Sequence, residues 1–399
     1  VGASSSMIYL LIAFSQGAAV GAGVIVAQYL GARDKKSVSD AVHTSLVIAG
    51  ILGIVLTIAG IVLSRQLLEW MKTPDEVMEQ AVTYFRLYSA GMFFGIVYNM
   101  AAGILNAAGN SKRSLLYLAV ASFTNIVLDI LFIAILDMGV AGAAIATDIS
   151  QAVSCILSMA FLMRVKDSYQ VSLKKLKIHR RIAGSMIRVG LPTGIQNMVI
   201  SLSNVLVQTS VNGFGAAAMA GYTAYLKVDG FNILPVMSFS MAVTTFAGQN
   251  YGAGNYDRVK KGMYVTLAMG FVYTVLTGAL LLTFDDQIMG MFSRDAEVIT
   301  CGKLAMKYFC PFYFILSILH GLSGALRGVG KSIPPMVVLL LSLCVFRIFW
   351  IWLVLPHFST IEGVYLLYPV SWALGAVMII IYACTAKWLP AGRQQGKVR

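Results

Sequence analysis

Long runs of apolar residues dominate this chain of 399 residues and exclude most soluble folds. Hydrophobic residues make up 58% of the sequence and charged residues only 12%, whereas a soluble domain carries roughly 25% charged residues. A helix that crosses a bilayer needs about 20 predominantly apolar residues. Eleven runs of this length are present, so the sequence predicts an all-α membrane protein with eleven transmembrane helices.

The predicted spans form two groups separated by a polar, basic stretch. The first group comprises Ser5–Leu30, Ala41–Leu63, Ala81–Leu105, Leu115–Leu136 and Ala141–Met163. The second comprises Leu191–Val211, Ala220–Gly248, Met263–Phe284, Leu304–Leu326, Met336–Leu355 and Val364–Trp388. We therefore predict an N-terminal lobe over residues 1–165, a basic linker over 166–187 and a C-terminal lobe over 188–399.

The net charge of +13 is distributed unevenly between the connections of these spans. One set of alternate connections, with the linker and the C-terminal tail, carries 22 Lys and Arg residues, and the other set carries 4. Such a bias places the basic segments in the cytoplasm. The positive charge therefore indicates membrane orientation, and we expect no nucleic-acid partner. Eleven helices then place Val1 on the outer side.

An internal repeat relates the two lobes at a constant offset of 221 residues. The segment Ala27–Ala32 aligns with Gly248–Ala253, and Gly109 aligns with Gly330. Since paired spans run in the same direction, the repeat is parallel, and its pseudo-two-fold axis lies along the membrane normal. Two pseudo-symmetric six-helix lobes are typical of secondary transporters.

The repeat also predicts a missing element. The second lobe begins with the span Leu191–Val211, and its counterpart would precede Val1. We therefore expect the first lobe to lack its first helix in this chain, and the intact protein to have twelve helices.

A few polar residues inside the predicted spans are functional candidates, because a charge at the centre of a membrane helix costs about 2.5–3.5 kcal/mol. Asp129 is the leading one, and Asn125 lies on the same helical face four residues earlier. Thr147, in the next span, could add an oxygen to this pair. A buried carboxyl favours protonation, whereas an ionised one with amide and hydroxyl oxygens beside it could bind Na⁺. A purely structural interhelical hydrogen bond is the alternative for Asp129.

A second polar set allows more than one role. Asp148 and Gln151 lie near Thr147, and either helix packing or function would explain them. For Lys227 and Asp229 the expectation is a mutual or neighbouring charge pair, and the alternative is a second coupling or substrate site. For Arg347 we expect pairing with a carboxylate or with a carbonyl of a broken helix.

Enzyme signatures are absent from the sequence. There is no complete Gly-x-x-x-x-Gly-Lys-Ser/Thr motif to hold phosphates, and the five cysteines and four histidines have no metal-site spacing. We therefore expect a protein that is not an enzyme and has no cofactor, with H⁺ or Na⁺ as a coupling ion.

Taken together, these motifs resemble the multidrug and toxic compound extrusion (MATE) family over essentially the whole chain. The resemblance rests on Gln28–Ala32 and Gln249–Ala253, Gly103–Gly109 and Gly324–Gly330, Asn125–Asp129, Gly139–Thr147, and Gly190-Leu191-Pro192. It implies a twelve-helix fold and a first-lobe coupling site that Asn125, Asp129 and Thr147 match. The family's further acid, on its first helix, has no counterpart here.

The function that this resemblance implies is export of small organic, mostly cationic compounds and drugs by H⁺ or Na⁺ antiport. We expect a monomer in the cell membrane, embedded in the lipid bilayer. The nearest alternative is a flippase for lipid-linked sugars, which would favour a more strongly charged cavity. A channel or a membrane-embedded enzyme is the alternative from another class.

Overall fold

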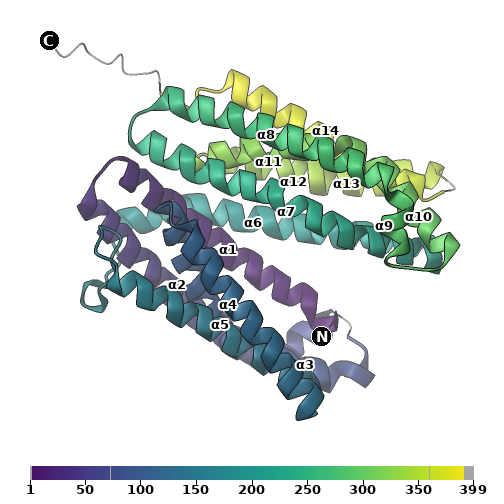
Figure 1. Cartoon of the computed structure of the whole chain (residues 1–399), viewed down its shortest axis with the longest axis horizontal. Coiled ribbons are helices and arrows are strands. Elements are labelled where there is room, and N and C mark those ends of the chain that lie inside the picture. The colour runs from purple at the N-terminus through teal and green to yellow at the C-terminus, as the bar shows by residue number, and fades with distance from the viewer. Residues whose placement is uncertain (1, 72, 359, 391–399) are drawn as a thin grey trace. The chain divides into compact units, whose positions relative to one another are not determined.

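The computed structural model describes residues 2–71, 73–358 and 360–390, and all regular structure in these residues is helical (Figure 1). Ten helices or helical runs among them are long and apolar enough to cross a membrane. The predicted eleventh span lies in α6 (Arg180–Asn212). This helix has the necessary length, but it is not among the ten because amide side chains such as Gln196 and Asn204 interrupt its apolar run. The prediction of an all-α, multi-pass membrane protein is confirmed.

The chain divides into two compact units, unit 1 over Val1–Asn197 and unit 2 over Met198–Arg399. The division falls inside α6, whereas we predicted the second lobe to begin at residue 188. Because α6 begins at Arg180, the last part of the predicted linker 166–187 is helical.

Unit 1 is a bundle built around one central helix. Its helices are α1 (Gly2–Gly31), α2 (Lys35–Trp70), α3 (Asp75–Ala107), α4 (Ser111–Asp129) and α5 (Gly139–Arg164), followed by the first part of α6. α3 packs against α1, α2 and α5, and α4 packs along α5. Residues from α1, α2 and α3 supply most of the buried apolar core.

Unit 2 repeats this plan with more interruptions. Its helices are α7 (Ala216–Gly252), α8 (Tyr256–Thr283), α9 (Asp285–Gly290), α10 (Ala296–Phe309), α11 (Tyr313–Gly328), α12 (Ile333–Leu340), α13 (Phe346–Phe349) and α14 (Glu362–Thr385). At the repeat offset, α3 corresponds to α10 and α11 together. A 3-10 turn containing Pro311 separates those two helices, because proline lacks the backbone N–H that a continuous helix needs.

The loop that joins α1 to α2 and the loop that joins α7 to α8 have the same backbone hydrogen bonds. The Ala32 amide donates to the Gln28 carbonyl, and the Ala253 amide donates to that of Gln249, at 3.0 Å in both. Asp34 then begins α2 as its N-cap and accepts from the backbone amide and hydroxyl of Ser37. These hydrogen bonds to the ionised carboxylate lower the pKa of Asp34.

Close helix crossings are repeated as well. A methyl group added at Gly103 would come within 2.8 Å of the Ala19 carbonyl oxygen. At Gly324 it would come within 2.5 Å of the Ser240 carbonyl oxygen. Both pairs are related by the offset of 221, so the same glycine permits the same backbone approach in each unit. Small residues at such crossings are typical of membrane helices.

The connection between α5 and α6, which contains the first part of the predicted basic linker, is docked against α2. The Ser172 amide donates to His43 Nε2 at 3.0 Å, and the Thr44 hydroxyl donates to the Lys177 carbonyl at 3.3 Å. Tyr169 and Val171 are buried beside these contacts. The first part of the linker therefore covers the end of unit 1.

The turns after α3 and α11 provide a test of the repeat. Gly109 and Gly330 have φ of 76° and 83°, and equivalent amide-to-carbonyl hydrogen bonds follow each of them. In this left-handed region a side chain costs roughly 1–2 kcal/mol. We expect Gly109→Ala and Gly330→Ala each to lower the free energy of unfolding by about this amount. The loss would be measured as a lower thermal unfolding midpoint of the protein in detergent.

Gly50→Ala is the matched control, because Gly50 lies within α2 and a methyl group there would meet no atom within 4 Å. Alanine has the higher helix propensity, so this variant should be neutral or slightly stabilised. Equal losses at all three positions would contradict the backbone argument.

Candidate functional site

A polar cavity of about 240 Å³ lies in unit 1 between α1, α3, α4 and α5. Its polar lining consists of Ser15, Gln16, Tyr88, Tyr98, Asn99, Ser122, Asn125, Ser150, Gln151 and Ser154. The Asn99 amide donates to the Ser15 hydroxyl at 3.3 Å, which joins α3 to α1 at the cavity wall. Among the described residues that line it there is no charged side chain. The cavity therefore offers neutral hydrogen-bonding groups within an apolar bundle.

The predicted coupling residues Asn125 and Asp129 lie at and beside this cavity on α4. Asn125 lines it, and Asp129 follows one helical turn later at the end of α4. In the described part of the chain, the buried atoms Asn125 Nδ2 and Asp129 Oδ1 have no hydrogen-bond partner. A buried polar atom without a partner costs about 1–3 kcal/mol, and more if it is charged. A proton or a cation at Asp129 would reduce this cost.

Thr147, the third predicted residue, lies on α5, which packs along α4. Its hydroxyl donates to the Ala143 carbonyl of its own helix at 2.9 Å. This bond occupies the hydroxyl hydrogen and leaves oxygen lone pairs available. A site shared by Thr147, Asn125 and Asp129 stays a prediction.

Asp148 and Gln151 pack against two glycines of α3. A methyl group at Gly91 would collide with the Asp148 carboxylate, and one at Gly95 would collide with the Gln151 side-chain oxygen. The Gln151 amide donates to the Tyr88 hydroxyl at 3.5 Å, whereas Asp148 Oδ1 is buried and has no described partner. The two glycines therefore make room for polar side chains from α5.

A π-helical segment, Ile130–Ile135, follows Asp129 directly. Its hydrogen-bond register is wider than that of an α-helix, and such segments often occur at functional sites. Unit 2 has a π-helical segment, Trp350–Val354, at nearly the equivalent position. The sequence did not reveal either segment, because a continuous apolar run has no residue that marks the change of register.

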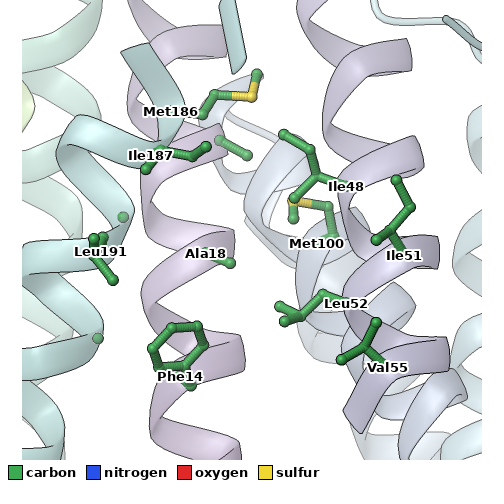
Figure 2. Close-up of a pocket in the computed structure, with 13 residues that line it drawn as sticks. Phe14, Ala18, Ile48, Ile51, Leu52, Val55, Met100, Met186, Ile187 and Leu191 are labelled. Carbon is green, nitrogen blue, oxygen red and sulfur yellow. The ribbon is translucent and has the colours of Figure 1, made fainter. Parts of the chain in front are cut away.

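A second cavity of unit 1, about 330 Å³ in volume, is entirely apolar. Figure 2 shows Phe14 and Ala18 of α1 between Leu191 of α6 and the α2 side chains from Ile48 to Val55. The face of α1 that carries Ser15 and Gln16 lines the polar cavity instead. α1 therefore separates a polar cavity from an apolar one.

The expected charge pair between Lys227 and Asp229 is absent from the described part of unit 2. The Tyr313 hydroxyl donates to Asp229 Oδ1 at 2.8 Å, and the Tyr225 and Tyr313 hydroxyl oxygens are 2.6 Å apart. Lys227 is exposed and lines a separate pocket with Gln208 and other residues. Two residues apart on one helix, the two side chains point in different directions, so the expectation was wrong.

Arg347 has hydroxyl and aromatic partners rather than the expected carboxylate. It is 3% exposed, and its guanidinium carbon lies 4.5 Å from the centre of the Tyr368 ring. Its hydrogen-bond acceptors are Ser203 at 3.1 Å, Ser371 at 3.2 Å and Asn204 at 3.4 Å. The Ser203 hydroxyl in turn donates to the Leu343 carbonyl, which lies in the π-helical segment Leu341–Val345. The broken-helix carbonyl is therefore satisfied by serine and not by Arg347.

Multiple membrane-crossing helices around a polar intramembrane cavity are the architecture of a membrane transporter. The MatE family profile matches residues 1–131 and 192–353, which is more than half of the chain. The chain therefore belongs to the MatE family, and the predicted resemblance is confirmed.

Individual relatives agree with this assignment. "Probable multidrug resistance protein YoeA" of Bacillus subtilis is 27% identical over an alignment of 394 residues, and the match covers 94% of this chain and 83% of that protein. A NorM protein of Thermotoga maritima, named in the same way, is 27% identical over 87% of this chain and 76% of its own length.

Solved structures show the same fold. A MOP superfamily transporter from Pyrococcus furiosus has a TM-score of 0.90 and 25% identity, covering 96% of this chain and 86% of that chain. An outward-facing multidrug resistance MATE family transporter has a TM-score of 0.89, 24% identity and coverage of 96% and 87%. The protein is accordingly a membrane transporter of the class to which these multidrug resistance proteins belong, and not an enzyme.

The contact between Gly91 and Asp148 can be tested by a double-mutant cycle. We expect Gly91→Ala to destabilise the protein by about 1–3 kcal/mol, because overpacking forces α3 and α5 apart. Asp148→Ala removes the colliding carboxylate and should restore most of the loss in the double variant. Thermal unfolding midpoints in detergent measure all four proteins. Additive effects of the two substitutions would show that the side chains do not meet.

Proposed function

We propose that this protein is a cation-coupled antiporter that exports small organic, mainly cationic compounds by alternating access. The names of its relatives support multidrug efflux as the overall process. The observation that carries the coupling proposal is the pair of buried, unpartnered polar atoms Asn125 Nδ2 and Asp129 Oδ1 beside the polar cavity of unit 1. A transporter that exchanges ion for substrate needs such a group, whose free energy changes strongly when an ion binds.

Either H⁺ or Na⁺ can serve at this group. A proton on Asp129 removes its charge and adds a hydrogen-bond donor. A sodium ion would take hard oxygen ligands from the Asp129 carboxylate, the Asn125 side-chain carbonyl and the Thr147 hydroxyl. Both ions neutralise the buried carboxylate, and each thereby stabilises one conformation of the transporter relative to the other.

The cavity suits an organic cation better than an anion. No Lys or Arg is among the described lining residues, whereas the carboxylates of Asp129 and Asp148 lie on helices that form its walls. Tyr88 adds an aromatic face, and a cation over such a face gains about 0.5–2 kcal/mol. Binding of a cation and of the coupling ion would then compete for the same negative charge.

The π-helical segment after Asp129 supports a conformational role for this position. A π-helical segment can change to the narrower hydrogen-bond register of an α-helix, and this change rotates the residues that follow the segment. We propose that ion binding at Asp129 biases this local change and so the switch between inward-open and outward-open states. The alternative for Lys227 and Asp229, a second coupling or substrate site, stays a prediction.

The same proposal covers the cellular setting. We place the protein in the cell membrane as a monomer, with the linker and the C-terminal tail in the cytoplasm. The support for this orientation is the 22-to-4 distribution of Lys and Arg between alternate connections.

Ethidium efflux from drug-sensitive cells tests the coupling role of Asp129. We expect Asp129→Asn to reduce efflux to the level of cells without the transporter, at equal membrane expression, because asparagine cannot bind and release the ion. Purified protein in vesicles with an imposed pH or Na⁺ gradient then identifies which ion drives transport.

Asp137→Asn is the matched control, since Asp137 is an exposed acid in the turn between α4 and α5. Its φ of 51° is a conformation that asparagine also tolerates. Full efflux in this variant is expected. Efflux that survives Asp129→Asn would remove Asp129 as the coupling group, and no efflux from the unsubstituted protein would favour a flippase or a narrower substrate.

A further inference from the structure

A large groove opens on unit 2 at one end of its bundle, far along the chain from the polar cavity of unit 1. It has a volume of about 840 Å³ and is formed by α8, α11, α14 and the residues after α14. Its wall is mainly apolar, with Leu267 and Phe271 from α8 and Leu322 from α11. Two exposed lysines, Lys260 and Lys387, also line it. This combination of apolar wall and paired positive charge has no role in the proposed antiport.

We propose that this groove binds an anionic phospholipid, with its phosphate between Lys260 and Lys387 and its acyl chains against the apolar wall. Basic pockets between transmembrane helices recognise anionic lipid headgroups. Each lysine near the membrane surface contributes about 1 kcal/mol to the binding of such a lipid.

The positions of the two lysines along their helices agree with a headgroup site. Lys260 lies in the first turns of α8, and Lys387 lies just beyond the end of α14 at Thr385. Leu267 and Phe271 follow Lys260 by about two and three helical turns, so they lie deeper in the hydrocarbon. Positive charge thus lies at the helix ends, where a lipid headgroup would be, and apolar surface lies below it, where the acyl chains would be.

Aromatic residues mark the boundary between these two levels. Tyr264 is 64% exposed one turn below Lys260, and the indole of Trp388 donates to the Ala383 carbonyl at 2.9 Å. Tyrosine and tryptophan are enriched where the hydrocarbon meets the headgroups. The groove therefore has the arrangement expected at a membrane–water interface.

The repeat shows what covers the equivalent surface in unit 1. Tyr264 corresponds to His43, which is 2% exposed because it accepts from the Ser172 amide of the linker. Tyr169 and Val171 of the same linker are buried there as well. Unit 1 thus covers this surface with its own chain, whereas the described residues of unit 2 leave the equivalent surface open.

The sequence after Pro390 carries positive charge and little apolar surface. At the repeat offset, glycine 392 replaces Val171, and residues 391–399 contain Arg393, Lys397 and Arg399 with valine as their only large apolar side chain. These three positive charges would be repelled by Lys260 and Lys387. An anionic lipid has the complementary charge and the apolar chains that the groove requires.

Native mass spectrometry of the full chain, purified in neutral detergent, tests this proposal with added phosphatidylglycerol and phosphatidylcholine. We expect retention of phosphatidylglycerol to exceed that of phosphatidylcholine. Lys260→Gln and Lys387→Gln should each weaken phosphatidylglycerol binding about five-fold. Lys261→Gln is the matched control, because it removes the neighbouring exposed charge of α8 that does not line the groove, and it should leave retention unchanged.

Ala268→Trp tests the acyl-chain part of the site without altering a charge. Ala268 is exposed and lines the groove, so the indole should fill it and reduce phosphatidylglycerol retention. Equal retention of the two lipids, or equal effects of Lys260→Gln and Lys261→Gln, would overturn the proposal. A gain in retention when the chain is ended at Pro390 would also overturn it, since the tail would then be the occupant. Because binding is measured directly, the result is independent of antiport.

Discussion

A bilayer leaves the backbone no water to bond with, so every spanning segment must satisfy its amides and carbonyls within itself. The helices of both units follow from this requirement, and their exceptions show where it is relaxed. The carbonyl of Leu343, in a π-helical segment, accepts from the Ser203 hydroxyl. Where Pro311 interrupts the α10–α11 run, the break is confined to a single 3-10 turn. At Leu343 a side-chain donor thus compensates for the irregular backbone.

Side chains under the same constraint behave differently in the two units. In unit 2 the charged side chains of Asp229 and Arg347 have neutral partners: Asp229 accepts from Tyr313, and Arg347 donates to serine hydroxyls. In unit 1, Asp129 and Asp148 each have a buried carboxylate oxygen without a described partner. The free energy to be gained from binding a proton or cation is therefore larger in unit 1. This asymmetry supports a coupling site in unit 1, although the two units share one repeat.

The sequence was sufficient to predict the features that depend on composition and on regular spacing. Apolar runs located the helices, and the offset of 221 located equivalent turns such as those at Gly109 and Gly330, which share one backbone conformation. The helical face shared by Asn125 and Asp129 also followed from spacing alone. Each of these features is local or repeats along the chain, so it can be read without knowing which helices touch.

Features that depend on tertiary contact could not be predicted in this way. Asp229 accepts from Tyr225, four residues earlier, at 3.3 Å, but its shorter hydrogen bond comes from Tyr313, which lies 84 residues away. Nothing near Asp229 in the sequence indicates this second tyrosine. The docking of the linker on His43 and Thr44 likewise required the fold. Polar groups in a membrane interior form hydrogen bonds with whichever donor or acceptor the helix packing brings near, so tertiary structure decides which groups pair. The sequence alone shows only that such a group lies in an apolar span, where its burial costs free energy. A buried acid can therefore be recognised from the sequence as a functional candidate. Whether a hydroxyl donates a hydrogen bond to it, or whether it needs a bound ion, depends on the side chains of the neighbouring helices.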